Sequence, residues 1–181
     1  MEKALTLASI VIALRPKVCI EIGVFGGRSL VAMALACKEV NGGVVHGIDP
    51  WKAQVSVAGQ TEADAQWWSK IDHEKLYQDY LKLIADAGVS AFVQTHRMTS
   101  DEAFPKMKWD AVGLLHVDGS HTEQAFRDIM NYSPLVQKGG ICVADDIEWA
   151  QGYVKLGFEY MKGIGFVELY KLGTGAAFMR L

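Results

Sequence analysis

The sequence predicts an α/β fold in which a doubly wound, mainly parallel seven-stranded sheet ends in an antiparallel hairpin. Two observations lead to this fold class. Short apolar runs alternate with longer amphipathic stretches five times along the 181 residues, which is typical of parallel strands joined by helices. The tail GFVELYKLGTGAAFMRL then contains two extended runs around residues 173–175, and this pattern predicts the closing hairpin.

Each predicted strand is a short run rich in apolar and β-branched residues. The runs are VCIEI (18–22), VVHGID (44–49), SAFVQTH (90–96), WDAVGLLHVD (109–118) and GGICVAD (139–145). The predicted helices carry apolar residues at helical spacing, and some of them stop at glycine. One precedes Pro16, and the others cover residues 28–40, 73–88, about 121–131 and about 150–162.

The stretch 51–73 is less regular and contains Trp51, Trp67 and Trp68. With Tyr77 and Tyr80 beyond it, this stretch forms either a lid or substrate-binding insertion, or a part of the core. Aromatic residues at helical spacing are more often core residues, so both interpretations stay open.

Length and composition suit one soluble domain that spans residues 1–181. The net charge is −3 and no dense basic run occurs, so we expect neither a nucleic-acid partner nor a membrane partner. The apolar N-terminal run is interrupted by Arg15 and Pro16, and we expect it to be a helix and not a signal peptide.

The three cysteines also bear on localisation. They are widely spaced, lie among apolar residues and lack metal-binding spacing, which favours a reducing, cytoplasmic environment; they are Cys19, Cys37 and Cys142.

Acidic residues stand at the ends of four of the five predicted parallel strands. They are Glu21, Asp49, Asp118 and the pair Asp145 and Asp146. A single such residue is most simply a helix cap. Ligands of open parallel sheets bind beyond the carboxyl ends of the strands, so several acids there predict one shared site.

The first predicted turn, EIGVFGGRS (21–29), brings glycines close to an acid. Gly23, Gly26 and Gly27 allow a ligand to approach the backbone, but their spacing is not the G-x-G-x-x-G of dinucleotide sites. Glu21 would repel a pyrophosphate and suits an ammonium or sulfonium ligand. Asp49, at the end of the next strand, can accept hydrogen bonds from the hydroxyls of a ribose.

These motifs resemble those of the class I S-adenosylmethionine-dependent methyltransferases, and the resemblance covers nearly the whole chain. EIGVFGGRS is similar to their first motif and GIDPW to their second. HVDGSHTEQAFRDI (116–129) followed by QKGGICVADDIEW (137–149) resembles the small-molecule O-methyltransferase branch with macrolide-sugar and cephalosporin-cluster enzymes, which is similar in layout to the catechol type. The resemblance implies the Rossmann-like fold of that class.

The resemblance also implies a set of cofactor contacts. Glu21, Gly23 and Ser29 would line the methionine end of S-adenosylmethionine, Asp49 would hold the ribose, and the adenine would lie near Met98, Thr99 and Ser100. The residues expected to bind the cofactor are therefore Glu21, Gly23, Gly26, Ser29, Asp49, Ser100 and Asp118.

A divalent metal is expected at Asp118, Asp145 and Asp146. Carboxylate oxygens favour Mg²⁺, or else Mn²⁺ or Ca²⁺, and relatives bind a divalent metal through acids at these positions. This chain has Asp-Asp where some relatives have Glu-Asp and catechol types have Asp-Asn. The alternative is that Asp118 caps a helix while the other two shape a turn.

His121 follows Asp118 in the DGSH motif, and a histidine at this place is the proposed base in macrolide-sugar relatives. We therefore expect His121 and Asp118 to be the catalytic residues, although a histidine that orients Asp118 is the simpler interpretation. Trp149 either flanks the substrate or packs the last helix. His116, within a strand, is expected to be structural.

The predicted function is transfer of a methyl group from S-adenosylmethionine to a hydroxyl of a small molecule, assisted by a divalent metal. A homo-oligomer is the expected assembly. Two alternatives remain at this point. One is an NAD-dependent oxidoreductase, and the other is a non-catalytic cofactor-binding scaffold.

Overall fold

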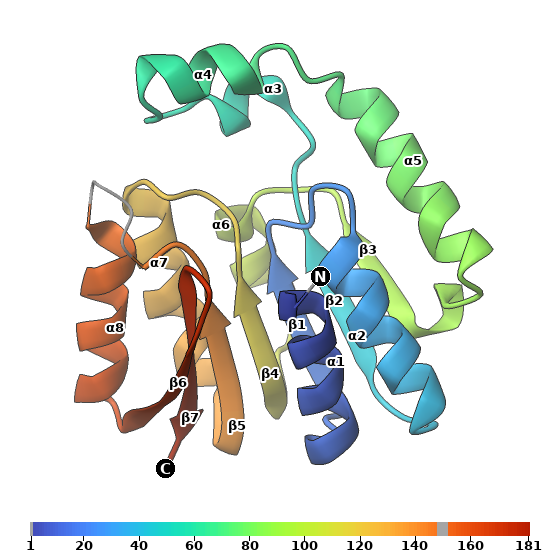
Figure 1. Ribbon diagram of the computed structural model, residues 1–181, viewed down its shortest axis with the longest axis vertical. Helices are drawn as coiled ribbons and strands as arrows, with labels where there is room; N and C mark the ends of the chain where they lie inside the picture. Colours follow the sequence, from blue (N-terminus) through green and yellow to red (C-terminus); the bar gives the residue numbers. More distant parts are fainter. Residues whose placement is uncertain (1, 148–151) are drawn as a thin grey trace.

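The computed structural model describes residues 2–147 and 152–181, and it contains one seven-stranded sheet in the order β3-β2-β1-β4-β5-β7-β6 (Figure 1). The strands β1 to β5 are parallel, and β7 is antiparallel to both of its neighbours. The predicted fold class, with its terminal hairpin, is therefore confirmed. The strands are β1 (Val18–Ile22), β2 (Val44–Ile48), β3 (Val93–His96), β4 (Val112–Val117), β5 (Val136–Ala144), β6 (Phe166–Leu172) and β7 (Gly175–Arg180).

Helices cover both faces of the sheet, and each face has its own hydrophobic core. On one face lie α1 (Glu2–Leu14), α2 (Arg28–Glu39) and α5 (His73–Asp86). On the other face lie α6 (Ser100–Ala103), α7 (Glu123–Tyr132) and α8 (Tyr153–Gly163). Burial on both faces explains why the central strands are almost continuously apolar.

Several element boundaries differ from the sequence-based ones. The expected strand 90–96 begins with a 3-10 turn at Ser90–Phe92, and the expected strand 139–145 begins at Val136 instead. The helix expected to begin at residue 121 begins at Glu123, because the Thr122 side chain accepts a hydrogen bond from the Gln124 backbone and caps it. Trp149 lies outside the described residues.

The stretch 51–73 contains two short helices, α3 (Ala53–Ser56) and α4 (Glu62–Trp68), which lie above the carboxyl ends of the parallel strands (Figure 1). Its three tryptophans behave differently. Trp51 is buried and stacks on Tyr80 with ring centroids 5.1 Å apart, so it belongs to the core. Trp67 is 55% exposed, and both Trp67 and Trp68 contact Phe25 in the first turn.

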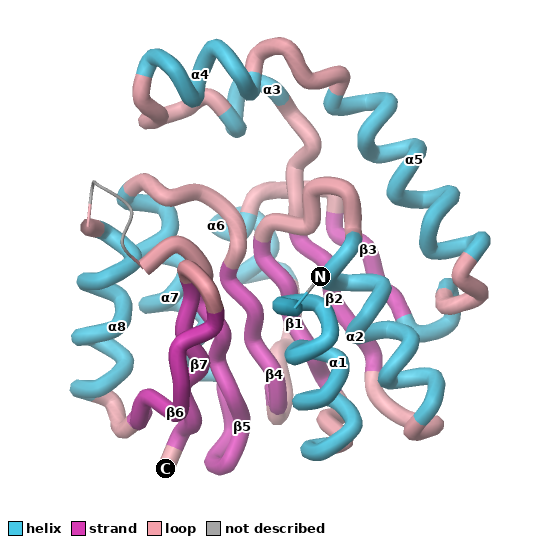
Figure 2. Tube along the Cα trace, in the orientation of Figure 1, coloured by secondary structure: helices cyan, strands magenta, loops and turns pink. Residues whose placement is uncertain are grey.

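The loops that follow the parallel strands gather at one end of the sheet (Figure 2). No helix among the described residues combines the length and apolar character that crossing a membrane requires. The division into domains and the assembly of the chain remain predictions.

Candidate active site

The pairing register of the parallel strands determines which residues meet at the carboxyl end of the sheet. Ile22 lies beside Ile48 on one side and beside Val117 on the other, and Val117 lies beside Ala144. The next residue in each strand therefore falls in one row across the sheet. That row consists of Gly23, Asp49, Asp118 and Asp145.

A pocket opens at this row. Its walls come from the loops after β1, β2, β3 and β4 and from α3 and α4. Among the residues that line it are Gly23, Asp49, Ser100, Asp118, Gln124 and Asp128. The predicted residues Gly23, Asp49, Ser100 and Asp118 are thus brought together, whereas Glu21, Gly26 and Ser29 are not in its lining.

Gly23 is required where the first turn crosses the loop after β4. Its φ is +86°, and a Cβ atom there would lie 2.3 Å from the carbonyl oxygen of Asp118 and 2.5 Å from the Cα of Gly119. No side chain fits this space, so only glycine lets the first turn pack directly against the backbone of the loop after β4 at the pocket. Gly26 has no comparable constraint, and Gly27, with φ +78° and Tyr80 packed against it, is the other constrained glycine of the turn.

Asp49 joins the first two loops of the pocket through its carboxylate. Oδ2 accepts hydrogen bonds from the backbone N–H groups of Val24 (3.0 Å) and Phe25 (2.9 Å), and Oδ1 accepts one from Trp51 (2.7 Å). Burial raises the pKa of the Asp49 carboxyl, and the three backbone donors oppose that rise. A carboxylate has about four acceptor positions, so about one remains for a ligand hydroxyl.

Glu21 lies two residues before Gly23, the first residue of this row, and is completely buried. Its Oε1 contacts the Ser29 hydroxyl and lies 2.8 Å from Nδ1 of His116, which is also completely buried. Oε2 has no hydrogen-bond partner among the described residues. His116 therefore holds Glu21 in place, while Oε2 is a buried acceptor that still lacks a donor among the described residues.

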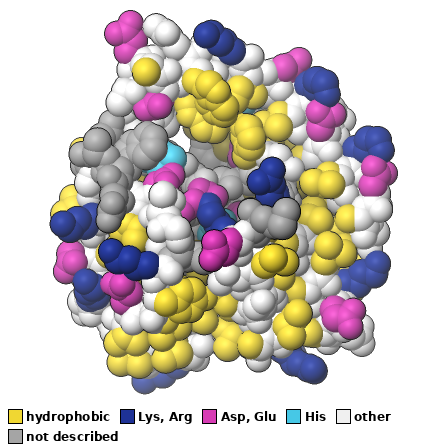
Figure 3. Space-filling model, in the orientation of Figure 1, with side chains coloured by type: hydrophobic (Ala, Val, Ile, Leu, Met, Phe, Trp, Pro, Cys, Tyr) yellow, Lys and Arg dark blue, Asp and Glu magenta, His cyan; other side chains and the backbone are white. Residues whose placement is uncertain are grey.

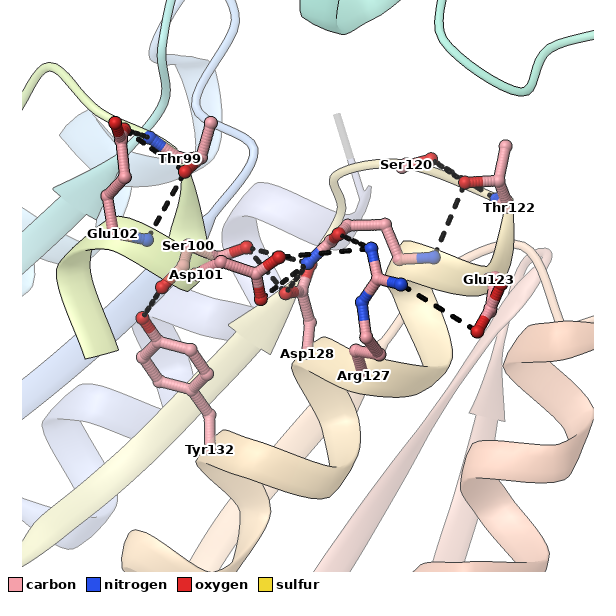
Figure 4. A network of polar contacts seen from close by, with 11 residues as sticks. Thr99, Ser100, Asp101, Glu102, Ser120, Thr122, Glu123, Arg127, Asp128 and Tyr132 are labelled. Atoms are coloured by element: carbon pink, nitrogen blue, oxygen red, sulfur yellow. Dashed lines mark hydrogen bonds and ion pairs between the residues drawn. The ribbon is translucent and has the colours of Figure 1, made fainter. Parts of the chain in front are cut away.

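Asp128 on α7 is the centre of a buried polar network under the loop after β3 (Figure 4). Its Oδ1 accepts hydrogen bonds from Ser100 Oγ (2.6 Å) and from Gln124 Nε2 (2.9 Å). Tyr132 donates to the backbone carbonyl of Ser100 at 2.7 Å. Burial, more than any other cause, raises the pKa of Asp128 to about 6. The network fixes the loop in which the adenine is expected.

The acidic residues Asp118, Asp145 and Asp146, here called the acidic rim, have different partners. Asp118 and Asp146 form a group with His121 in which one candidate ligand atom from each lies within 4.8 Å of the others. His121 Nε2 lies 2.6 Å from Asp146 Oδ2. Two carboxylates and one imidazole are a donor set that suits a divalent cation.

Asp145, the third residue of the expected metal set, is engaged elsewhere. It is buried, its Oδ1 accepts a hydrogen bond from Thr174 Oγ1 at 3.0 Å, and its Oδ2 contacts the Lys3 ammonium. Lys3 also lies 3.0 Å from Asp118 Oδ2. Lys3, Gln124 and Asp128 were not singled out from the sequence, because nothing near them in the chain indicates their distant partners.

Comparison with known proteins gives a family model and a set of similar folds. The family model described as a methyltransferase domain matches residues 20–147. No curated protein matches the chain.

Three solved structures illustrate the likeness of the fold. The O-methyltransferase NovP has 16% identity and a TM-score of 0.76, with 99% of this chain and 78% of that chain covered. The O-methyltransferase TomG from Streptomyces achromogenes, in complex with SAM, has 16% identity and a TM-score of 0.69, covering 97% and 76%. An O-methyltransferase from Bacillus cereus, in complex with SAH, has 13% identity and a TM-score of 0.67, covering 98% and 80%.

The family match includes all four strand ends that form the row at the pocket. It also spans the glycine turn and the DGSH motif on which the resemblance of the sequence depends. Because it covers more than half of the chain, and because the strand order agrees with that of the class I fold, this chain belongs to the methyltransferase-domain family.

Proposed function

We propose that this protein transfers the methyl group of S-adenosylmethionine to a hydroxyl oxygen of a small molecule, assisted by a divalent cation at the acidic rim. One observation carries the proposal. The strand register places Gly23, Asp49 and Asp118 at one pocket, and His121 and Asp146 lie beside Asp118.

The cofactor assignments follow from the row. Gly23 lines the pocket and lets the first turn pack against the loop after β4, and the remaining acceptor position of Asp49 suits one ribose hydroxyl. Glu21 does not line the pocket, but its buried Oε2 lacks a hydrogen-bond donor among the described residues, and the ammonium of the methionine part would supply one. Ser100 stays assigned to the adenine side. We assign Gly26 and Ser29 to the shape of the turn and not to direct contact, since neither lines the pocket.

Asp118 and Asp146 are the proposed ligands of the cation, which is Mg²⁺ or Mn²⁺. When bound, the cation would lower the pKa of a hydroxyl placed next to it. Asp145 was expected to share this role, but its carboxylate oxygens already have Thr174 and Lys3 as partners. We therefore propose Asp145 as a residue that positions the rim.

His121 is the proposed base. Its contact with Asp146 orients the imidazole, which takes the proton of the acceptor hydroxyl. The acceptor oxygen then forms a bond to the methyl carbon while the sulfur–methyl bond breaks. The products are a methyl ether and S-adenosylhomocysteine, and the main contribution of the protein is to hold oxygen, carbon and sulfur in line.

A second role for His121 is favoured by one observation, because its ring belongs to the same close group as the two carboxylates. It would then be a third metal ligand. His121→Ala separates the two roles. A base leaves Mn²⁺ affinity nearly unchanged and lowers turnover by about 100-fold or more, whereas a ligand lowers the affinity itself.

The test of the function begins with calorimetric titration of S-adenosylhomocysteine and NAD into the protein. Binding of S-adenosylhomocysteine without NAD supports the proposal, and the reverse favours the oxidoreductase alternative. Turnover is then measured with a panel of sugars and phenols and Mg²⁺. Asp118→Ala should abolish it and leave cofactor affinity within a few fold, whereas Asp79→Ala, an exposed helix position paired with Lys75, should not change it.

Two outcomes contradict the proposal. Turnover by Asp118→Ala equal to that of the unchanged protein would remove the cation from the reaction. Cofactor binding without transfer to any acceptor would favour the scaffold alternative.

A further inference from the structure

Lys3 reaches from the first helix into the acidic rim. Its Nζ lies 3.0 Å from Asp118 Oδ2 and contacts Asp145 Oδ2, so one ammonium bridges two carboxylates that stand at the ends of different strands. The Lys3 side chain is 31% exposed, and that of Asp145 is 8% exposed. Acidic and basic side chains meet near the middle of this face of the molecule (Figure 3).

The bridge has an electrostatic cause. Asp145 is withdrawn from water between β5 and the loop before β7, and Thr174 supplies one hydrogen bond to it. A buried carboxylate is costly without an opposite charge, and Lys3 supplies that charge. The side chain of Asp118 is 27% exposed and lines the pocket, so the same ammonium also acts on the proposed metal ligand.

A divalent cation and Lys3 therefore need the same carboxylate. An ammonium is a donor only and cannot coordinate a metal, and two positive centres on one carboxylate repel each other. Asp146 does not take part in this competition, because its carboxylate contacts His121 and not Lys3 in the described part of the chain.

We propose that the Lys3 ammonium is the resident cation of the acidic rim and that a divalent ion must displace it from Asp118 in order to bind there. Lys3 is then a positioning residue that weakens metal binding and holds the rim together without metal. α1 thereby becomes the element that controls metal affinity. This inference rests on the proposed function only in placing the divalent ion at Asp118.

The experiment measures Mn²⁺ binding by electron paramagnetic resonance to the whole chain, free of other metals, in the unchanged protein and in Lys3→Met. We expect Lys3→Met to bind Mn²⁺ at least about tenfold more tightly, because one neighbouring positive charge is gone. Lys3→Arg keeps the charge and should bind Mn²⁺ as weakly as the unchanged protein. Lys82→Met is the matched control, since it removes a helix lysine that is paired with Asp86 of the same helix.

Thermal unfolding gives a second readout that does not depend on activity. Without metal, Lys3→Met should unfold at a lower temperature than Lys82→Met, because Asp145 loses its counter-charge. Mn²⁺ should raise the unfolding temperature of Lys3→Met more than that of the unchanged protein.

Equal or weaker Mn²⁺ affinity in Lys3→Met overturns the inference, and so does the lack of Mn²⁺ binding in every variant. Titration of S-adenosylhomocysteine into the same variants judges the proposed function separately. If Lys3→Met binds S-adenosylhomocysteine normally and its Mn²⁺ affinity equals that of the unchanged protein, the proposed role of Lys3 is refuted. The proposed methyl transfer is not affected by that result. If the unchanged protein does not bind S-adenosylhomocysteine, the proposed function is refuted.

Discussion

Substituting asparagine for Asp128 should stabilise the protein at neutral pH and have little effect in acid. Asp128 is 1% exposed, and burial raises the pKa of its carboxyl from 3.8 to about 6. Both of its side-chain hydrogen bonds, from Ser100 and Gln124, go to the same oxygen, Oδ1. The amide oxygen of asparagine can accept both bonds, so the substitution removes the charge and preserves the network.

The expected magnitude follows from the pKa. A folded-state pKa raised above the unfolded value means that the folded state binds the proton more tightly, so stability is fully present below the unfolded pKa and is lost as pH rises through the folded one. A rise from 3.8 to about 6 corresponds to about 3 kcal/mol over the whole range. Between about pH 5 and about pH 7.5 the loss attributable to Asp128 is about 1 kcal/mol.

The assay is urea unfolding of the unchanged protein and Asp128→Asn at these two pH values, without cofactor. The free energy of unfolding of the variant relative to the unchanged protein should increase by about 1 kcal/mol from the lower to the higher pH. Other titrating groups cancel in this difference, including His46, whose pKa is lowered to about 4 mainly by burial. A pH-independent difference, or one that falls as pH rises, would refute the assignment of the raised pKa to Asp128.

Three further substitutions test the architecture of the pocket. Gly23→Ala should cost more than about 1 kcal/mol of stability and abolish S-adenosylhomocysteine binding by calorimetry, because its methyl group would meet the Asp118 carbonyl. Asp49→Asn should lower stability by about 1–3 kcal/mol in urea unfolding and weaken cofactor binding, because an amide nitrogen cannot accept the backbone hydrogen bonds. Glu21→Gln should lower the unfolding temperature by disrupting the buried contact with His116; an unchanged temperature would show that this contact adds nothing to stability.

The sheet and the general place of the site could be predicted from the sequence because both depend on local periodicity. Apolar runs of strand length separated by amphipathic stretches are sufficient to indicate parallel strands, and parallel strands direct their carboxyl ends to one edge. Asp49 and Asp118 each follow a strand directly, so their meeting at one pocket needed only the fold class.

The partners of the acids could not be predicted in this way. Lys3 contacts Asp118 and Asp145 across more than a hundred residues, and no local pattern distinguishes it from any other lysine on an amphipathic helix. The same holds for Asp128, which reads as an ordinary polar residue of α7 until the loop after β3 is packed over it. Burial of a charge by distant segments leaves no periodic trace in the sequence.

Glu21 shows what exact register adds to such a prediction. As an acidic residue just before the glycine turn, Glu21 suited the role of a cofactor ligand. In the sheet, however, it lies beside His116, and His116 is two residues before Asp118. The row that reaches the pocket begins at Gly23, two residues after Glu21 and on the same face of the strand. Glu21 itself is completely buried below that row, where an acid needs a partner and His116 supplies it. Any effect of Glu21 on the cofactor must act through its unpartnered Oε2 or through the turn that it anchors with Ser29.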